Sequence, residues 1–513
     1  MSSLMKVIIT TLLFFNFSCL LYSQNNNLSY PIVDTGQLDF YNNTGIIQNP
    51  SPGEKFYGQD AHYSGFEPSY TDNGDGTITD NVTGLMWQKS FIRIEWGEAE
   101  SEAINASTGG YDDWRVPTIK ELYSLILFTG NQGTGDPSSP TPPPDAEPFI
   151  DLDFFDFEYP TDSRYIDAQY VTNTVYTWTT MDGNPTFFGV NFADGRIKGY
   201  PQNLDNKLYY ARFVRGNSTY GNNQFVDNED NTITDEATGL MWTKIDSGNN
   251  IFSDLVSQFT KTDGSLNWEE ALEMAENLEF AGFDDWRLPN AKELHSIVDY
   301  SRSPDATNSA AINPLFECSV IINEAGSSDY PAYWASTSFN PGSDAIVIYF
   351  GRALGYMQLP PGLDFYDVHG AGTQRTDPKT GDPSYGFGPQ GDVRRVYNYI
   401  RFVRDDENIS QIGYENESIP DKIILEQNYP NPFNPTTNIK FSISGIETAN
   451  KSISTKLTVY DLLAREVDTL VDKNLSPGNY EIIFDASGLA SGIYFYNLTA
   501  DNFTQTKKML LIR

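Results

Sequence analysis

One phrase occurs twice in this chain of 513 residues. Residues 110–125 read GYDDWRVPTIKELYSL, and residues 282–297 read GFDDWRLPNAKELHSI. Ten of the sixteen aligned positions are identical. A long phrase repeated within one chain predicts that the fold is built from two copies of one structural unit.

Four further blocks repeat in the same order around this phrase, which extends the duplication over most of the chain. The matched pairs are residues 70–89 with 225–244, 96–100 with 268–272, 176–180 with 333–337, and 209–216 with 398–405. Helical and strand-like patterns alternate within each copy, so we expect an α+β domain. The predicted domains are residues 28–216 and 220–405, with a polar linker at 216–224.

The end of the repeated phrase predicts the start of a helix. Thr118 is followed three residues later by Glu121, and Asn290 is followed by Glu293. This spacing is that of a capping box, in which the two side chains satisfy free backbone N–H groups at a helix N-terminus.

The middle of the phrase is interpreted as structural. We expect Trp114 and Trp286 to be buried core residues. The adjacent acids at 112–113 and 284–285 could be catalytic, but neighbouring side chains usually point apart. We expect Arg115 and Arg287 to neutralise them as ion pairs.

The N-terminus is typical of an export signal. Lys6 precedes a short apolar run at residues 7–15, and a cleavage point follows residue 23. The run is shorter than the roughly 20 residues that a membrane span requires. Removal of residues 1–23 leaves Cys318 as the single cysteine, so no intramolecular disulfide is expected. A net charge of −36 argues against nucleic acid as a partner.

The pattern changes after the second copy. Residues 406–422 are acidic and poor in apolar side chains, which predicts an exposed linker. From residue 423, alternating apolar and polar residues recur between turn signals, without a helical period. A small β-sandwich is therefore expected for residues 423–513.

The repeated blocks TGLMW, DDWR-P--KEL and RFVR together resemble the Lcl C-terminal domain family, which is named from Legionella collagen-like adhesins. The resemblance covers most of residues 70–216 and 225–405. It implies two tandem C-type-lectin-like domains in a secreted or surface protein. It also implies a role in attachment, because the best-known member of the family binds sulfated glycans.

Residues 425–443 read LEQNYPNPFNPTTNIKFSI, and residues 485–498 read DASGLASGIYFYNL. These segments resemble the type A sorting domain of the type IX secretion system. The resemblance implies the outer-membrane secretion machinery as a partner and a released or surface-anchored product. We expect Lys507 and Lys508 to lie at an exposed strand edge that is recognised there.

Two acidic turns are candidates for calcium sites. Carboxylate oxygens at alternating short spacings suit calcium, but Asp-Gly is also a common hairpin turn. The candidate ligands are Asp72, Asp75 and Asp80 in the first copy and Asp227, Asp230 and Asp235 in the second.

Residues 363–392 form a long loop that only the second copy contains, and loops of this length are often functional. A sugar or metal site is the functional hypothesis for this loop, and an ordered but inert cover over the strands is the structural interpretation beside it. The candidate ligand-binding residues are His369, Gln374, Arg375, Asp377, Lys379, Asp382 and Tyr385.

The sequence contains no His-Glu-x-x-His and no Gly-x-Ser-x-Gly motif. We therefore expect a non-enzymatic, adhesin-like protein that binds carbohydrate or another surface ligand. A glycan-processing enzyme with paired carboxylates and a purely structural envelope protein are the alternatives.

Overall fold

The computed structural model describes residues 28–406 except 182, 205 and 361, and residues 412–413 and 422–512 except 429, 445–452, 464, 476–477 and 501–502. These residues separate into two compact units, which divide between residues 406 and 412. The expected signal peptide at 1–23 and most of the acidic linker lie outside the described residues. None of the helices in the described ranges is long and apolar enough to cross a bilayer.

The first copy consists of short strands and two short helices. A small hairpin, β1 (Phe40–Tyr41) and β2 (Ile46–Ile47), precedes it. Its elements are β3 (Tyr70–Asp72), β4 (Thr77–Asp80), β5 (Leu85–Gln88), β6 (Ile92–Ile94), α1 (Ala99–Asn105), α2 (Ile119–Tyr123), β7 (Gln169–Tyr170), β8 (Val175–Thr180), β9 (Asn184–Asn191), β10 (Arg196–Pro201), β11 (Tyr209–Ala211) and β12 (Val214–Gly216).

The second copy repeats this order and adds strands near its end. Its elements are β13 (Phe225–Asp227), β14 (Thr232–Asp235), β15 (Leu240–Thr243), α3 (Ser253–Val256), α4 (Trp268–Glu276), α5 (Ala291–Ser296), α6 (Pro304–Thr307), β16 (Ile321–Ile322), β17 (Ser328–Asp329), β18 (Ala332–Phe339), β19 (Asp344–Tyr349), β20 (Leu354–Leu359), β21 (Gly362–Asp367), β22 (Gln374–Pro378), β23 (Ser384–Phe387), β24 (Asp392–Arg394) and β25 (Val403–Asp405). The fold is therefore rich in strands, and the expected C-type-lectin-like likeness stays a prediction.

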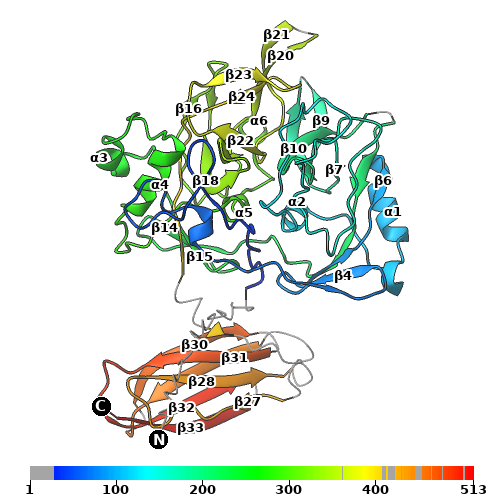
Figure 1. Ribbon diagram of the computed structural model, residues 1–513. Coiled ribbons are helices and arrows are strands. Elements are labelled where there is room, and N and C mark those ends of the chain that lie inside the picture. Colours follow the sequence, from blue (N-terminus) through cyan, green and yellow to red (C-terminus); the bar gives the residue numbers. More distant parts are fainter. Residues whose placement is uncertain are drawn as a thin grey trace, which may run out of the picture. The chain divides into compact units, whose positions relative to one another are not determined.

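The two copies share one sheet. Its strand order is β18-β19-β22-β10-β9-β7-β11-β6, with β8 paired to β9 at the side. Strand β22 of the second copy lies beside β10 of the first, where Ile197 is opposite Gln374. Figure 1 shows the first copy in blue and cyan and the second in green and yellow, joined along this sheet.

A common core accompanies the common sheet. One cluster of buried residues contains Leu122 and Ile126 of the first copy together with Leu294 and Ile348 of the second. The expected polar linker belongs to the same core, because Tyr220 is buried against Tyr30, with ring centroids 4.7 Å apart. The two copies thus form one compact unit instead of two separate domains.

The repeated phrase builds the start of α2 and of α5. Both predicted capping boxes are present, at Thr118–Glu121 and at Asn290–Glu293. Trp114 and Trp286 are each 3% exposed, as expected for core residues. Each indole N–H donates to a backbone carbonyl within its own copy. The phrase is therefore a structural brace.

The expected ion pairs of the brace were assigned to the wrong partners. Arg115 and Arg287 bind the capping-box residues Glu121 and Glu293 instead of the adjacent acids. The second acid of each phrase pairs with the last arginine of the closing strand. These pairs are Asp113 with Arg215 and Asp285 with Arg404.

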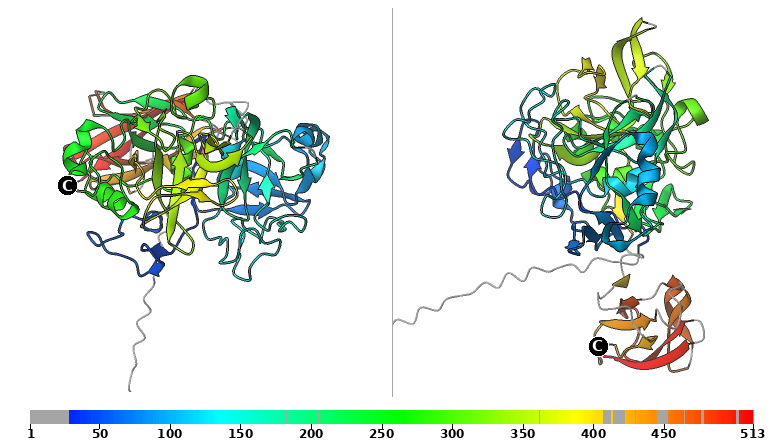
Figure 2. Two further views of the ribbon diagram at one scale, coloured as in Figure 1. Left: turned by 90° about the horizontal axis from the view of Figure 1, so that it is seen from above. Right: turned by 90° about the vertical axis from the view of Figure 1, so that its right-hand side faces the viewer.

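Residues 363–392, expected to form a long loop, contain most of β21 and all of β22 and β23. Strand β22 completes the shared sheet, and the other strands form a small sheet of order β21-β20-β24-β23. The β20–β21 hairpin projects from the body of this unit in Figures 1 and 2.

The C-terminal unit is the expected β-sandwich. Two four-stranded sheets, β26-β31-β28-β27 and β30-β29-β32-β33, enclose a core that includes Phe441 and Leu498. Its strands are β26 (Ile412–Gly413), β27 (Ile424–Leu425), β28 (Thr436–Ile443), β29 (Ile453–Tyr460), β30 (Glu466–Leu475), β31 (Gly478–Asp485), β32 (Gly492–Ala500) and β33 (Phe503–Leu511).

The edge of β33, expected to be open, is partly covered. Gln427 and Asn431 donate side-chain N–H groups to the carbonyl oxygen of Lys508. Phe433 exchanges backbone hydrogen bonds with residues 510 and 512. The Lys508 side chain remains exposed, whereas Lys507 is half-buried.

Candidate functional site

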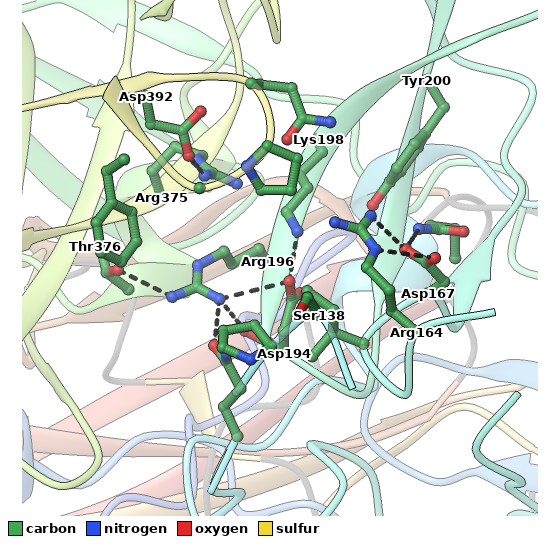
Figure 3. A pocket seen from close by; sticks show the side chains of 18 of the residues that line it. Ser138, Arg164, Asp167, Asp194, Arg196, Lys198, Tyr200, Arg375, Thr376 and Asp392 are labelled. Carbon is green, nitrogen blue, oxygen red and sulfur yellow. Dashed lines mark hydrogen bonds and ion pairs between the residues drawn. The ribbon is translucent and has the colours of Figure 1, made fainter. Parts of the chain in front are cut away.

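A cavity of about 680 Å³ lies where the two copies meet. Strand β10 and residues 132–138 and 164–169 of the first copy line it on one side. Residues 375–377 and 387–394 of the second copy line it on the other. Cavities of 300–1,000 Å³ are typical of small-ligand sites. We call this the junction cavity, and Figure 3 shows its lining.

Alternation along β10 places its polar side chains in the cavity. Arg196, Lys198 and Tyr200 line it, whereas the intervening Ile197 is in the shared core. This follows from the strand period of two, which sends successive side chains to opposite faces. The intervening Gly199 lies against the backbone of His369, so a larger side chain does not fit there.

Arg196 and Lys198 share one carboxylate. Asp194 is completely buried and forms an ion pair with each of them. Arg196 also donates to Gln132 of the first copy at 2.6 Å and to Thr376 of the second at 3.1 Å. Burial, together with the charges of Arg196 and Arg375, lowers the pKa of Lys198 to about 8 even though Asp194 opposes the shift.

The second copy contributes a similar arrangement on the opposite wall. Arg375 and His369 both contact the carboxylate of Asp392, the histidine through Nε2 at 3.0 Å. Burial lowers the pKa of His369 to about 4, and Arg375 adds to the effect. His369 is therefore neutral at physiological pH. Although burial opposes it, Arg375 holds the pKa of Asp392 well below its usual range.

The lining combines many charges in a small space. Six of the chain's 33 lysines and arginines and six aspartates are part of it. Arg164 pairs with Asp167, and Arg394 pairs with Asp344. Four buried polar atoms of the lining have no hydrogen-bond partner within the described part of the chain: Gln169 Oε1, Asp194 Oδ1, the Tyr200 hydroxyl and Arg375 Nη1. Buried polar atoms normally have partners, so these atoms are candidates for ligand contacts.

The structure brings two of the seven sequence-predicted residues into this cavity, Arg375 and Asp377. Asp377 accepts from Asn398 at 2.9 Å, and burial raises its pKa to about 6. His369 and Gln374 are buried behind the lining. Lys379 is buried elsewhere, with its Nζ 3.8 Å from the ring centroid of Trp268.

The remaining two predicted residues lie on the surface outside the cavity lining. Asp382 is exposed, and Tyr385 is 60% exposed. Its ring packs against Tyr356 and Phe365 on the small sheet of the insertion. The seven residues predicted from the loop are therefore not one site.

Sequence reasoning missed the first-copy half of the cavity. Arg196 and Lys198 form a signal that could have revealed it, because two cations alternate with Ile197 and Gly199 in a very acidic chain. A strand that carries basic residues at every second position presents them on one face.

The acidic turns are stabilised by their own side chains. Asp75 and Asp230 each accept from the backbone and side chain of a threonine two residues later. Asp72 and Asp227 each cap their turn and bind a lysine.

Asp80 and Asp235 are buried and accept from neighbouring backbone N–H groups. Across the described ranges, no group of three or more His, Cys, Asp or Glu side chains lies close enough to hold a metal ion. The candidate calcium ligands are thus not brought together as a set.

Comparison with known families accounts for both units. The family model of the Lcl C-terminal domain matches residues 76–215 and 231–361, which is more than half of the chain. The model of the secretion system C-terminal sorting domain matches residues 427–512. No curated protein and no solved structure matches the chain. The chain therefore belongs to the Lcl C-terminal domain family, with two copies of that domain ahead of a type IX secretion sorting domain.

Proposed function

We propose that this exported protein binds a carbohydrate in the junction cavity without transforming it. The observation that carries the proposal is the cavity itself, which neither copy forms alone. Its lining presents many hydrogen-bond donors and acceptors in a largely buried space, and such a lining suits a ligand with many hydroxyl groups. We also propose that each copy is a variant of the C-type-lectin-like fold.

The charges favour a saccharide that carries an acidic group. The lining as a whole carries as many aspartates as cations, but in the described residues Arg196, Lys198 and Arg375 form their ion pairs with two carboxylates, those of Asp194 and Asp392. Burial lowers the pKa of Arg196 and of Lys198, the attraction of Asp194 opposes this shift, and repulsion from Arg375 adds a smaller lowering. An anionic group of the ligand would offset that repulsion, because Coulomb interactions are stronger in a partly desolvated site than in water.

A glycan-processing enzyme is the second candidate, and one residue favours it. Asp377 lines the cavity with a pKa raised to about 6, and a raised pKa is typical of a general acid. The other buried carboxylates of the cavity are tied to arginine or lysine, which favours binding over acid catalysis. Incubating the protein with oligosaccharides and measuring new reducing ends tests this alternative. Cleavage that is lost in Asp377→Asn would establish an enzyme.

Binding is tested on a glycan array that carries uronic-acid, sulfated and neutral oligosaccharides. We expect the purified full chain to retain acidic members, and Arg196→Met to weaken that binding at least tenfold. Lys55→Met is the matched control, because Lys55 is an exposed cation outside the cavity. Absence of any acidic ligand, or equal binding by Arg196→Met, would contradict the proposal.

The sorting domain directs delivery through type IX secretion to the outer surface or the medium. We expect deletion of residues 423–513 to retain the protein in the periplasm, as measured by cell fractionation. Unchanged export after the deletion would refute this role of the sorting domain.

A further inference from the structure

A second hollow of about 500 Å³ adjoins the junction cavity. Strand β8 of the first copy lines one side of it, and α6, β20 and β21 of the second copy contribute to the other. Met181 lines both hollows. Its φ of 45° lies in the left-handed region, which is uncommon for a residue other than glycine and is enriched at functional sites.

The second hollow contains the most exposed tryptophan of the chain. All eight tryptophans are described; six are buried and Trp96 is partly buried, whereas Trp178 is 52% exposed. The corresponding strand of the second copy, β18, is buried over its whole length, and the buried Ala335 occupies the position that aligns with Trp178. Exposure of Trp178 is therefore not required by the repeated fold.

Local geometry turns Trp178 outward. Tyr176 and Thr180 lie two residues to either side of it, and both are buried. Regular alternation would therefore bury Trp178 as well. The pairing of β8 with β9 is irregular between Val175 and Thr179. Such irregularities re-aim side chains and occur often beside binding sites.

Polar groups suited to hydroxyl recognition line the same hollow. Arg352 binds Asp305 through two hydrogen bonds of 2.8 and 2.6 Å, and both side chains remain partly exposed. Asp367 accepts from the hydroxyl of Tyr176 at 2.9 Å. The Arg352–Asp305 pair is neutral overall, so this hollow does not require a charged ligand.

We propose that this hollow is a second saccharide site, in which a neutral sugar ring stacks on Trp178. The C–H face of a pyranose carries partial positive charge and complements the negative face of an aromatic ring. Its hydroxyl groups then lie at the edge of the ring, where planar groups such as the Arg352–Asp305 pair can donate and accept. The inference rests on the proposed function for the class of ligand, but on different residues.

Met181 forms a wall that the junction cavity and the second hollow share. A saccharide that places an acidic residue in the junction cavity can place a neutral residue on Trp178. Two contacts on one chain strengthen binding because the second contact is intramolecular.

The test is calorimetric titration of the full chain with neutral hexasaccharides of β-1,4-glucose, β-1,4-xylose and β-1,4-mannose, and with hexagalacturonate. We expect at least one neutral hexasaccharide to bind. Trp178→Ala should weaken that binding at least tenfold, and Trp178→Phe, which keeps a flat ring, should retain most of it. Ile104→Ala is the control, because Ile104 is 70% exposed and lies outside both hollows.

Two results would overturn the inference: no neutral hexasaccharide binds, or Trp178→Ala binds as the wild type does. Arg196→Met separates the two proposals. If this variant loses hexagalacturonate while Trp178→Ala changes nothing, the second site fails and the junction cavity stands. If Trp178→Ala loses the neutral hexasaccharide while Arg196→Met changes nothing, the second site stands and the proposed function fails.

Discussion

At the residue scale, His369 couples stability to pH. The pKa of this buried histidine is lowered to about 4, first by burial and then by Arg375 and Lys198, while Asp392 acts in the opposite direction. As pH falls below the ordinary histidine value of 6.5, the unfolded chain binds a proton that the folded chain resists. The stabilisation by neutral His369 is therefore complete above pH 6.5 and is lost between pH 6.5 and 4.

Replacement by glutamine isolates this contribution. We expect the wild type to lose up to about 3 kcal/mol relative to His369→Gln as pH falls through that window. Denaturant unfolding of both proteins at several pH values measures the difference. His369→Gln is needed as the reference because other groups also titrate in this window. The pKa of Asp377 is raised to about 6, so this group stabilises the fold as pH falls, which is opposite to the effect of His369. If the free energy of unfolding changed with pH in the same way for both proteins, this role of His369 would be contradicted.

The structural roles of single residues in the brace could be predicted where those roles depend on residues nearby in the sequence. The caps at Thr118 and Asn290 depend on residues three positions away, and the sequence displays that spacing directly. The partners of Asp113 and Asp285 lie more than a hundred positions away on the closing strands. Charge alone made Arg115 and Arg287 equally plausible partners, so the sequence favoured the nearer residue.

At the element scale, the contact of β10 with β22 joins the two copies. Gly199 on β10 is adjacent to the second copy, and a Cβ atom there would lie 2.5 Å from the carbonyl oxygen of His369. Backbone cannot yield as a flexible side chain can. The absence of a side chain at Gly199 is therefore a condition of the joint.

We expect Gly199→Ala to destabilise the body by about 1–3 kcal/mol, the range typical of overpacking. The measurement is denaturant unfolding. Gly97→Ala is the matched control, because no heavy atom lies within 4 Å of a Cβ built at Gly97. Equal stability of the two variants would show that β10 and the second copy can move apart at Gly199 without loss of stability.

There is a physical reason why the sequence did not predict β22 as a strand. Residues 363–392 are rich in Gly, Pro and Asp, which favour turns. The partners of β22 are β19 and β10, and β10 belongs to the other copy. A short polar strand between two distant partners leaves no local signal. The sequence displayed the alternating cations of β10, but nothing local indicates that β10 pairs with β22, so the first-copy half of the junction cavity was missed.

At the scale of the whole molecule, residues 28–406 form one body with a shared core, and the sorting domain forms a core of its own. The two copies bury each other's core side chains, so the stability of each copy depends on the other. The duplication was visible in the sequence, but the sharing of the core was not, because it depends on the pairing of β10 with β22, which no local pattern displays.

We expect calorimetric unfolding of the full chain to show one cooperative transition for residues 28–406 and another for the sorting domain. A fragment of residues 28–216 should not unfold cooperatively, because it lacks the second-copy side of the shared core. Separate transitions for the two copies, or a stable first-copy fragment, would show that they are independent domains.

Hydrogen–deuterium exchange of the full chain with hexagalacturonate tests most directly whether the junction of the two copies is the binding site. We expect saturating ligand to slow exchange in peptides that cover residues 194–201 of the first copy and 374–378 and 392–394 of the second. The acidic turns at residues 72–80 and 227–235 should be unchanged. Protection confined to one copy, or found at the acidic turns instead, would contradict a site built by both copies.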